Sequence, residues 1–76
     1  MEKLMAAAAK KPTDTLIGAG LMLVDMTDKA ARMSRAAITD TLIARHPELH
    51  AAAEAWSEDL ETELDLIEVI ALELAA

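Results

Sequence analysis

Residues 45–56 read RHPELHAAAEAW, a stretch in which a proline stands between two helix-forming segments. Pro47 suits the first position of a helix, because that position needs no backbone N–H and the proline φ is already helical. Glu48 then places a negative charge at the positive end of the helix dipole. The residue before a proline avoids the α region, so an incoming helix should end just before it. We therefore expect two helices joined by a turn at residues 46–47.

The same stretch contains both histidines of the chain, His46 and His50, four residues apart. Zinc proteases use His-Glu-x-x-His on one helix, with the glutamate as general base. Here the order is His-Pro-Glu-Leu-His, and His46 precedes the helix instead of lying on it. A structural zinc site also needs a fourth ligand, which has no obvious source. We expect a helix corner at this point and no metal site.

The composition indicates one small all-α domain. The chain has 76 residues and no cysteine, so neither a disulfide nor a thiolate metal site is available. Phenylalanine and tyrosine are absent, and Trp56 is the only aromatic residue. The apolar content is mostly alanine, leucine, isoleucine and methionine, all of which are common in helices.

Upstream of the corner, apolar residues recur at alternating steps of three and four from residue 16 to residue 44, with Asp40 as the one exception. This spacing predicts a helix over about 14–45 with one apolar face. Thr27 and Asp28 are also good helix-capping residues, so the alternative is a break near 25–27. We favour the continuous helix.

Downstream of the corner, the same spacing continues from residue 49 to residue 74 and predicts a second helix over about 47–75. Residues 1–12 are expected to form a flexible or short-helical N-terminal arm, since Lys-Lys-Pro ends any helix there. Residues 13–76 then form a helical hairpin. The second helix carries a stripe of acidic residues on its outer face, which we expect to face a partner: Glu54, Glu58, Glu61, Asp65 and Glu68.

A short corner predicts that the two helices lie antiparallel, so that residues equally distant from the turn face each other. Trp56 would then lie in the core opposite Ala37, and Arg35 would lie near Glu58. Several apolar residues near the open end of the hairpin remain unused, and large exposed apolar patches usually mark an interface. We expect a homodimer that forms a four-helix bundle. Its interface would contain Ile17, Leu21, Val24, Leu66, Val69 and Leu72.

The charge of the chain is strongly asymmetric. Its net charge is −7, yet residues 1–45 carry seven basic and five acidic residues, hence +2, and residues 46–76 carry nine acids and no lysine or arginine, hence −9. This balance argues against direct binding of nucleic acid or of an anionic membrane. The apolar run at residues 16–24 is far shorter than the roughly 20 residues that span a bilayer. We see no targeting segment and expect a cytoplasmic protein.

The residues that catalysis requires are scarce, because the only serines are Ser34 and Ser57 and there is no cysteine or tyrosine. Gly18 and Gly20 lack the strand and spacing of a phosphate loop, and helical glycines more often permit close approach of another helix. We expect no catalytic residue and no cofactor. The leading hypothesis is a non-enzymatic acidic helical protein that homodimerises and binds another protein as a regulator, inhibitor or adaptor. The alternatives are an acidic nucleic-acid mimic that blocks a nucleic-acid-binding protein, and an oligomerisation element of a larger assembly.

Overall fold

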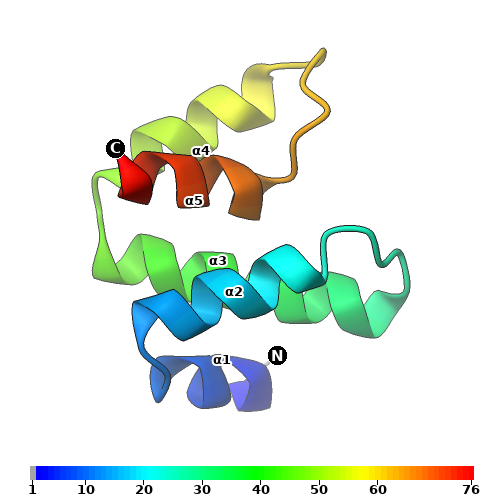
Figure 1. The fold of residues 1–76 in the computed structure, drawn as a ribbon, viewed down its shortest axis with the longest axis vertical. Helices are drawn as coiled ribbons and strands as arrows, with labels where there is room; N and C mark the ends of the chain where they lie inside the picture. Colours follow the sequence, from blue (N-terminus) through cyan, green and yellow to red (C-terminus); the bar gives the residue numbers. More distant parts are fainter. Residues whose placement is uncertain (1) are drawn as a thin grey trace.

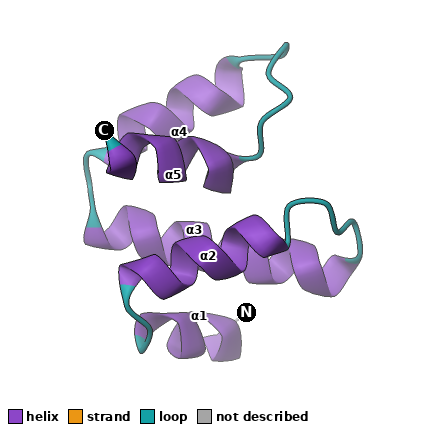
Figure 2. Ribbon diagram, in the orientation of Figure 1, coloured by secondary structure: helices purple, strands orange, loops and turns teal. Residues whose placement is uncertain are grey.

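The computed structural model describes residues 2–76, which form five helices and, within that range, no strand (Figures 1 and 2). The all-α prediction is therefore confirmed. Figure 1 shows α2 lying over α3, with α1 on one side of this pair and the α4–α5 hairpin on the other. The helices are α1 (Glu2–Ala9), α2 (Thr13–Met22), α3 (Lys29–Arg45), α4 (Leu49–Glu58) and α5 (Leu66–Ala75).

The prediction of one continuous helix over about 14–45 is wrong, because residues 23–28 separate α2 from α3. Asp28 is the N-cap of α3, and its Oδ2 accepts the backbone N–H of Ala31 at 3.3 Å. A capping carboxylate at this position satisfies a donor that would otherwise be unpaired and favours a new helix start. The structure thus has the break that the Thr27-Asp28 pair allowed.

The second long helix is also interrupted, at residues 59–65. Asp65 is the N-cap of α5: its side chain accepts the N–H of Ile67 at 3.2 Å, and Glu68 Oε1 accepts the N–H of Asp65 at 3.0 Å. This reciprocal pair is a capping box, which starts a helix. A continuous helix would also have stacked Asp59 on Glu63, a like-charge pair four residues apart that opposes helix formation. The chain therefore turns back, and α5 packs against α4.

Two arginines of α3 tie the ends of the preceding helices to it. Arg45 donates hydrogen bonds to the carbonyl oxygens of Ala8 (3.4 Å) and Ala9 (3.1 Å), which end α1. Arg35 donates from Nη1 to the carbonyl oxygens of Leu23 and, at 2.8 Å, of Met26, in the segment after α2. A cation at a helix C-terminus pairs with unsatisfied carbonyls and complements the helix dipole. The N-terminal segment is thereby held on α3, with Ala8 buried.

Arg35 also reaches the α4–α5 hairpin. Its Nε lies 3.6 Å from Asp65 Oδ2, and only 12% of its side chain is exposed. The ion pair forms with Asp65, the cap of α5, rather than with the predicted partner Glu58, because the chain reverses between α4 and α5. One side chain of α3 therefore connects the loop after α2 with the start of α5.

The core lies where α2, α3 and α5 meet. Its fully buried large side chains are Leu16, Leu42, Ile67 and Ile70. Gly20 allows α2 to pack close to α5, because a Cβ at this position would lie 2.6 Å from Cγ1 of Ile67. The same construction at Gly18 meets no atom within 4 Å. Of the two helical glycines, Gly20 alone is needed for packing.

Candidate interaction surface

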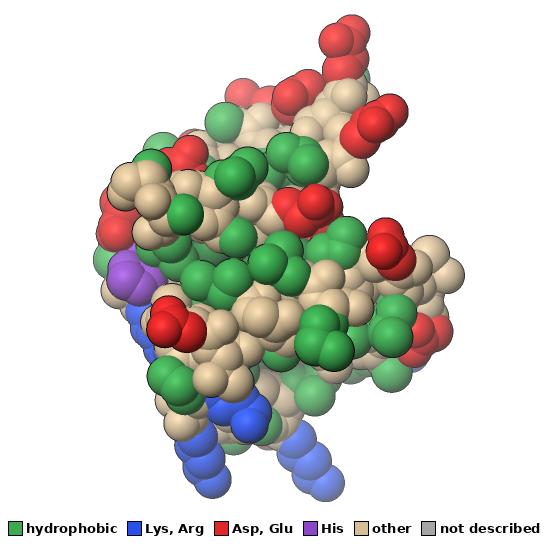
Figure 3. Space-filling view, in the orientation of Figure 1, with side chains coloured by type: hydrophobic (Ala, Val, Ile, Leu, Met, Phe, Trp, Pro, Cys, Tyr) green, Lys and Arg blue, Asp and Glu red, His purple; other side chains and the backbone are tan. Residues whose placement is uncertain are grey.

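An open apolar groove follows the seam between α2 and α5, and we refer to it as the α2–α5 groove. It consists of two adjoining hollows of about 270 Å³ and about 460 Å³, which share Ala71. Figure 3 shows hydrophobic side chains gathered along this seam, with acidic side chains nearby. The first hollow is lined by Leu21, Leu64, Glu68, Ala71 and Leu72, and the second by Thr13, Asp14, Ile17, His46, Ala71, Leu74 and Ala75.

The helix periodicity explains why large apolar side chains face this groove. Leu16 and Gly20 are buried on the side of α2 that faces the core. Leu21 lies about a quarter turn around the helix from Gly20, at the rim of the groove. On α5 the buried Ile67 and Ile70 face inward in the same way, and Leu72 lies outside them. Leu21 remains 42% exposed and Leu72 64% exposed. Two leucines on adjacent helices thus present apolar surface to solvent on one face.

The six residues predicted for a dimer interface do not form one patch. Ile17, Leu21 and Leu72 line the α2–α5 groove. Val24 and Leu66 are half-buried and pack against the core, and Val69 lines a separate cavity on the α4 side of α5. A hairpin of two unbroken helices would place these six residues together at its open end. Both helices are interrupted in the structure, so the six residues are separated.

The predicted acidic stripe is also divided, because its residues lie on three segments. Glu54 and Glu58 are exposed on α4, and Glu61 is exposed in the loop that follows. Asp65 and Glu68 are half-buried and cap α5. Only the first three are left fully available to a partner.

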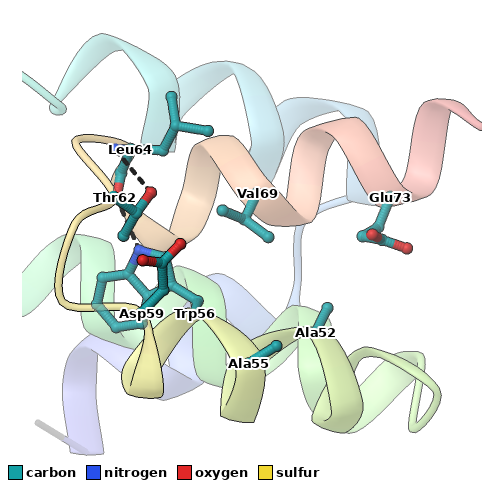
Figure 4. A pocket seen from close by; sticks show the side chains of 8 residues that line it. All are labelled: Ala52, Ala55, Trp56, Asp59, Thr62, Leu64, Val69 and Glu73. Atoms are coloured by element: carbon teal, nitrogen blue, oxygen red, sulfur yellow. Dashed lines mark hydrogen bonds between the residues drawn. The ribbon is translucent and has the colours of Figure 1, made fainter.

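A further cavity, of about 280 Å³, lies between α4 and α5, and we refer to it as the α4–α5 cavity (Figure 4). Trp56 lines it and is half-buried, whereas the sequence placed this residue in the core opposite Ala37. Its Nε1 donates a hydrogen bond of 2.7 Å to the carbonyl oxygen of Leu64, in the loop between the two helices. The full lining consists of Ala52, Ala55, Trp56, Asp59, Thr62, Leu64, Val69 and Glu73.

The histidine corner forms a local contact. His46 is the C-cap of α3, and its Nδ1 lies 3.5 Å from Oε1 of Glu48. His50 is exposed on α4. Within residues 2–76, no three histidine or carboxylate side chains are grouped closely enough to hold a metal ion.

Over the same range, none of the helices combines the length and the apolar character needed to cross a membrane. No protein-family model, curated protein or solved structure matches the chain.

Proposed function

We propose that this chain is a non-enzymatic helical protein that homodimerises through the α2–α5 groove and binds another protein as a regulator, inhibitor or adaptor. The observation that carries the proposal is the exposure of three leucines around one hollow of the groove: 42% for Leu21, 42% for Leu64 and 64% for Leu72. Each fully buried leucine stabilises a fold by about 1.5–3 kcal/mol, so completing the burial of all three contributes about 2–4 kcal/mol per protomer. A two-fold interface uses this surface twice.

The charge distribution supports a second copy as the occupant of the groove. Lys3, Lys10 and Lys11 lie on or just after α1, and Figure 3 shows lysine and arginine side chains at that end of the molecule. The opposite end contains α4, α5 and their loop, where residues 46–76 carry nine acids and no lysine or arginine. A two-fold axis along the seam brings the basic end of each protomer over the acidic end of its partner. Complementary charge of this kind selects one orientation over others.

The acidic half of the chain also supports binding of a different protein that is basic. Residues 46–76 have a net charge of −9, and Glu54, Glu58 and Glu61 are exposed. The negative electrostatic field of this half accelerates association with a positively charged protein and disfavours binding of acidic proteins. The shortage of nucleophilic side chains, with no cysteine or tyrosine in the chain, favours binding over catalysis.

Sedimentation equilibrium tests the proposal with a matched pair of variants. Leu72→Gln removes apolar surface from the groove, whereas Leu60→Gln changes a residue that is 96% exposed in the loop after α4 and lies outside the groove. We expect a dimer for the wild type and for Leu60→Gln. Leu72→Gln should weaken the dimer about 30-fold, because about 1 kcal/mol is lost on each side of the interface. A monomeric wild type, or an equal effect of both substitutions, would contradict the proposal.

A further inference from the structure

We propose that the α4–α5 cavity receives an arginine side chain of the basic partner, with the guanidinium stacked on Trp56 and paired with the carboxylate of Asp59, while Glu73 adds negative charge at the other end of the cavity. This inference rests on the proposed binding of another protein and specifies the chemistry that the partner must present. The cavity lies on the α4 side of α5 and shares only Leu64 with the lining of the α2–α5 groove, so substitutions at the other lining residues test the two sites separately.

The size and walls of the cavity suit one long side chain. Its volume of about 280 Å³ lies at the lower end of the roughly 300–1,000 Å³ that ligand pockets occupy, so a single side chain fits better than a cofactor. Ala52, Ala55 and Val69 give it apolar walls, against which the methylene groups of an arginine can pack. Figure 4 shows Val69 on one helix facing the two alanines on the other.

The charged groups of the cavity are both acidic. Asp59 lies beside the Trp56 ring, and Glu73 lies at the other end of the cavity (Figure 4). Asp59 Oδ1 accepts the N–H of Glu61 at 3.0 Å, which orients the carboxylate. No lysine or arginine occurs in residues 46–76 to neutralise these two groups from the same hairpin. A cation is therefore the complementary occupant.

The orientation of Trp56 selects arginine among the cations. The polar edge of the indole is already used, because Nε1 donates to the Leu64 carbonyl at 2.7 Å. What remains for a ligand is the face of the ring, which attracts a cation. A guanidinium is planar, stacks on such a face and keeps its N–H donors free at its edges for carboxylates, whereas an ammonium does not stack. The single aromatic residue of the chain thus lies half-exposed at an acidic cavity, while the core closes without it.

The test uses Trp56 as its own reporter, since it is the only tryptophan and there is no tyrosine. The probe is acetyl-Ala-Arg-Ala-amide, titrated into the full chain while the tryptophan emission is recorded. The control probe replaces arginine with citrulline, which has nearly the same shape and no charge. We expect a saturable emission change with the arginine probe and binding at least tenfold weaker with the citrulline probe.

Two substitutions on the protein complete the test. Asp59→Asn should weaken the arginine probe about fivefold, as expected for the loss of one exposed charge pair, and the asparagine Oδ1 can still accept the N–H of Glu61. Asp40→Asn removes the same charge from an exposed position of α3 that does not line the cavity, and should leave the affinity unchanged within twofold. Far-UV circular dichroism confirms that both variants retain their helices.

Three results would overturn the inference: no saturable change with the arginine probe, equal binding of the two probes, or equal weakening by Asp59→Asn and Asp40→Asn. The last result would mean that only the overall negative field acts on the probe. None of these results changes the sedimentation behaviour of Leu72→Gln, so failure of this site remains distinguishable from failure of the proposed dimer.

Discussion

Replacing Gly20 with alanine probes the close contact between α2 and α5. The added Cβ would lie 2.6 Å from Cγ1 and 3.0 Å from Cδ1 of Ile67, and 3.4 Å from Cγ2 of Ile38. Ile67 has no exposed surface and cannot move into solvent, so the overpacking should cost about 1–3 kcal/mol. Alanine regains about 0.5–1 kcal/mol over glycine within a helix. We expect Gly20→Ala to lower the free energy of unfolding by about 0.5–2 kcal/mol.

Gly18→Ala is the matched control, because it lies two residues away in the same helix and its added Cβ meets no atom within 4 Å. It should stabilise the fold by about 0.5–1 kcal/mol through helix propensity alone. The two variants share that propensity gain, so the difference between them, about 1–3 kcal/mol, reports the packing cost. Urea denaturation followed by circular dichroism gives both free energies, and the difference corresponds to at least about 4 °C in Tm. If both substitutions stabilise equally, α2 does not pack on Ile67 as described.

Two further predictions concern the polar contacts that join the helices, and urea denaturation measures both. Arg35→Met should destabilise the fold by about 1.5–3 kcal/mol, because its bonds to backbone carbonyls and to Asp65 are charge-assisted. Arg32→Met, which replaces an exposed arginine of the same helix, should change stability by less than about 0.5 kcal/mol, and similar losses for both arginines would argue against the bridging role of Arg35. Asp28→Ala should cost about 1 kcal/mol as the loss of an N-cap. Asp65→Ala should cost more, since Asp65 also belongs to the capping box and pairs with Arg35, and a smaller cost than for Asp28→Ala would contradict that arrangement.

The helical class of the fold follows from the sequence because composition and apolar spacing both indicate helices. The helix breaks do not follow from that spacing. Leu23 and Met26 lie in step with the helical pattern on both sides, so the period continues across a segment that is not helical. The signal that decides the first break is the cap at Asp28, a local hydrogen bond that a count of apolar residues does not register.

The second break had a visible signal in the like-charge pairs four residues apart, such as Asp59 with Glu63, and in the Asp65-x-x-Glu68 spacing. Leu60 belongs to the apolar spacing of residues 49–74, yet the structure leaves it 96% exposed. The residues of the α4–α5 cavity come together because of this break. The α4–α5 cavity exists only because the chain reverses, so neither the position of Trp56 beside Val69 nor the ion pair between Arg35 and Asp65 follows from a straight hairpin.

The proposed dimer is tested most directly by isotope-filtered nuclear Overhauser measurements on a mixture of ¹³C-labelled and unlabelled protein. Contacts between protomers should appear at the methyl groups of Leu21 and Leu72, which line the α2–α5 groove, and be absent at Leu60. The absence of any such contact at Leu21 and Leu72, or contacts confined to Val69 on the other side of α5, would contradict the account.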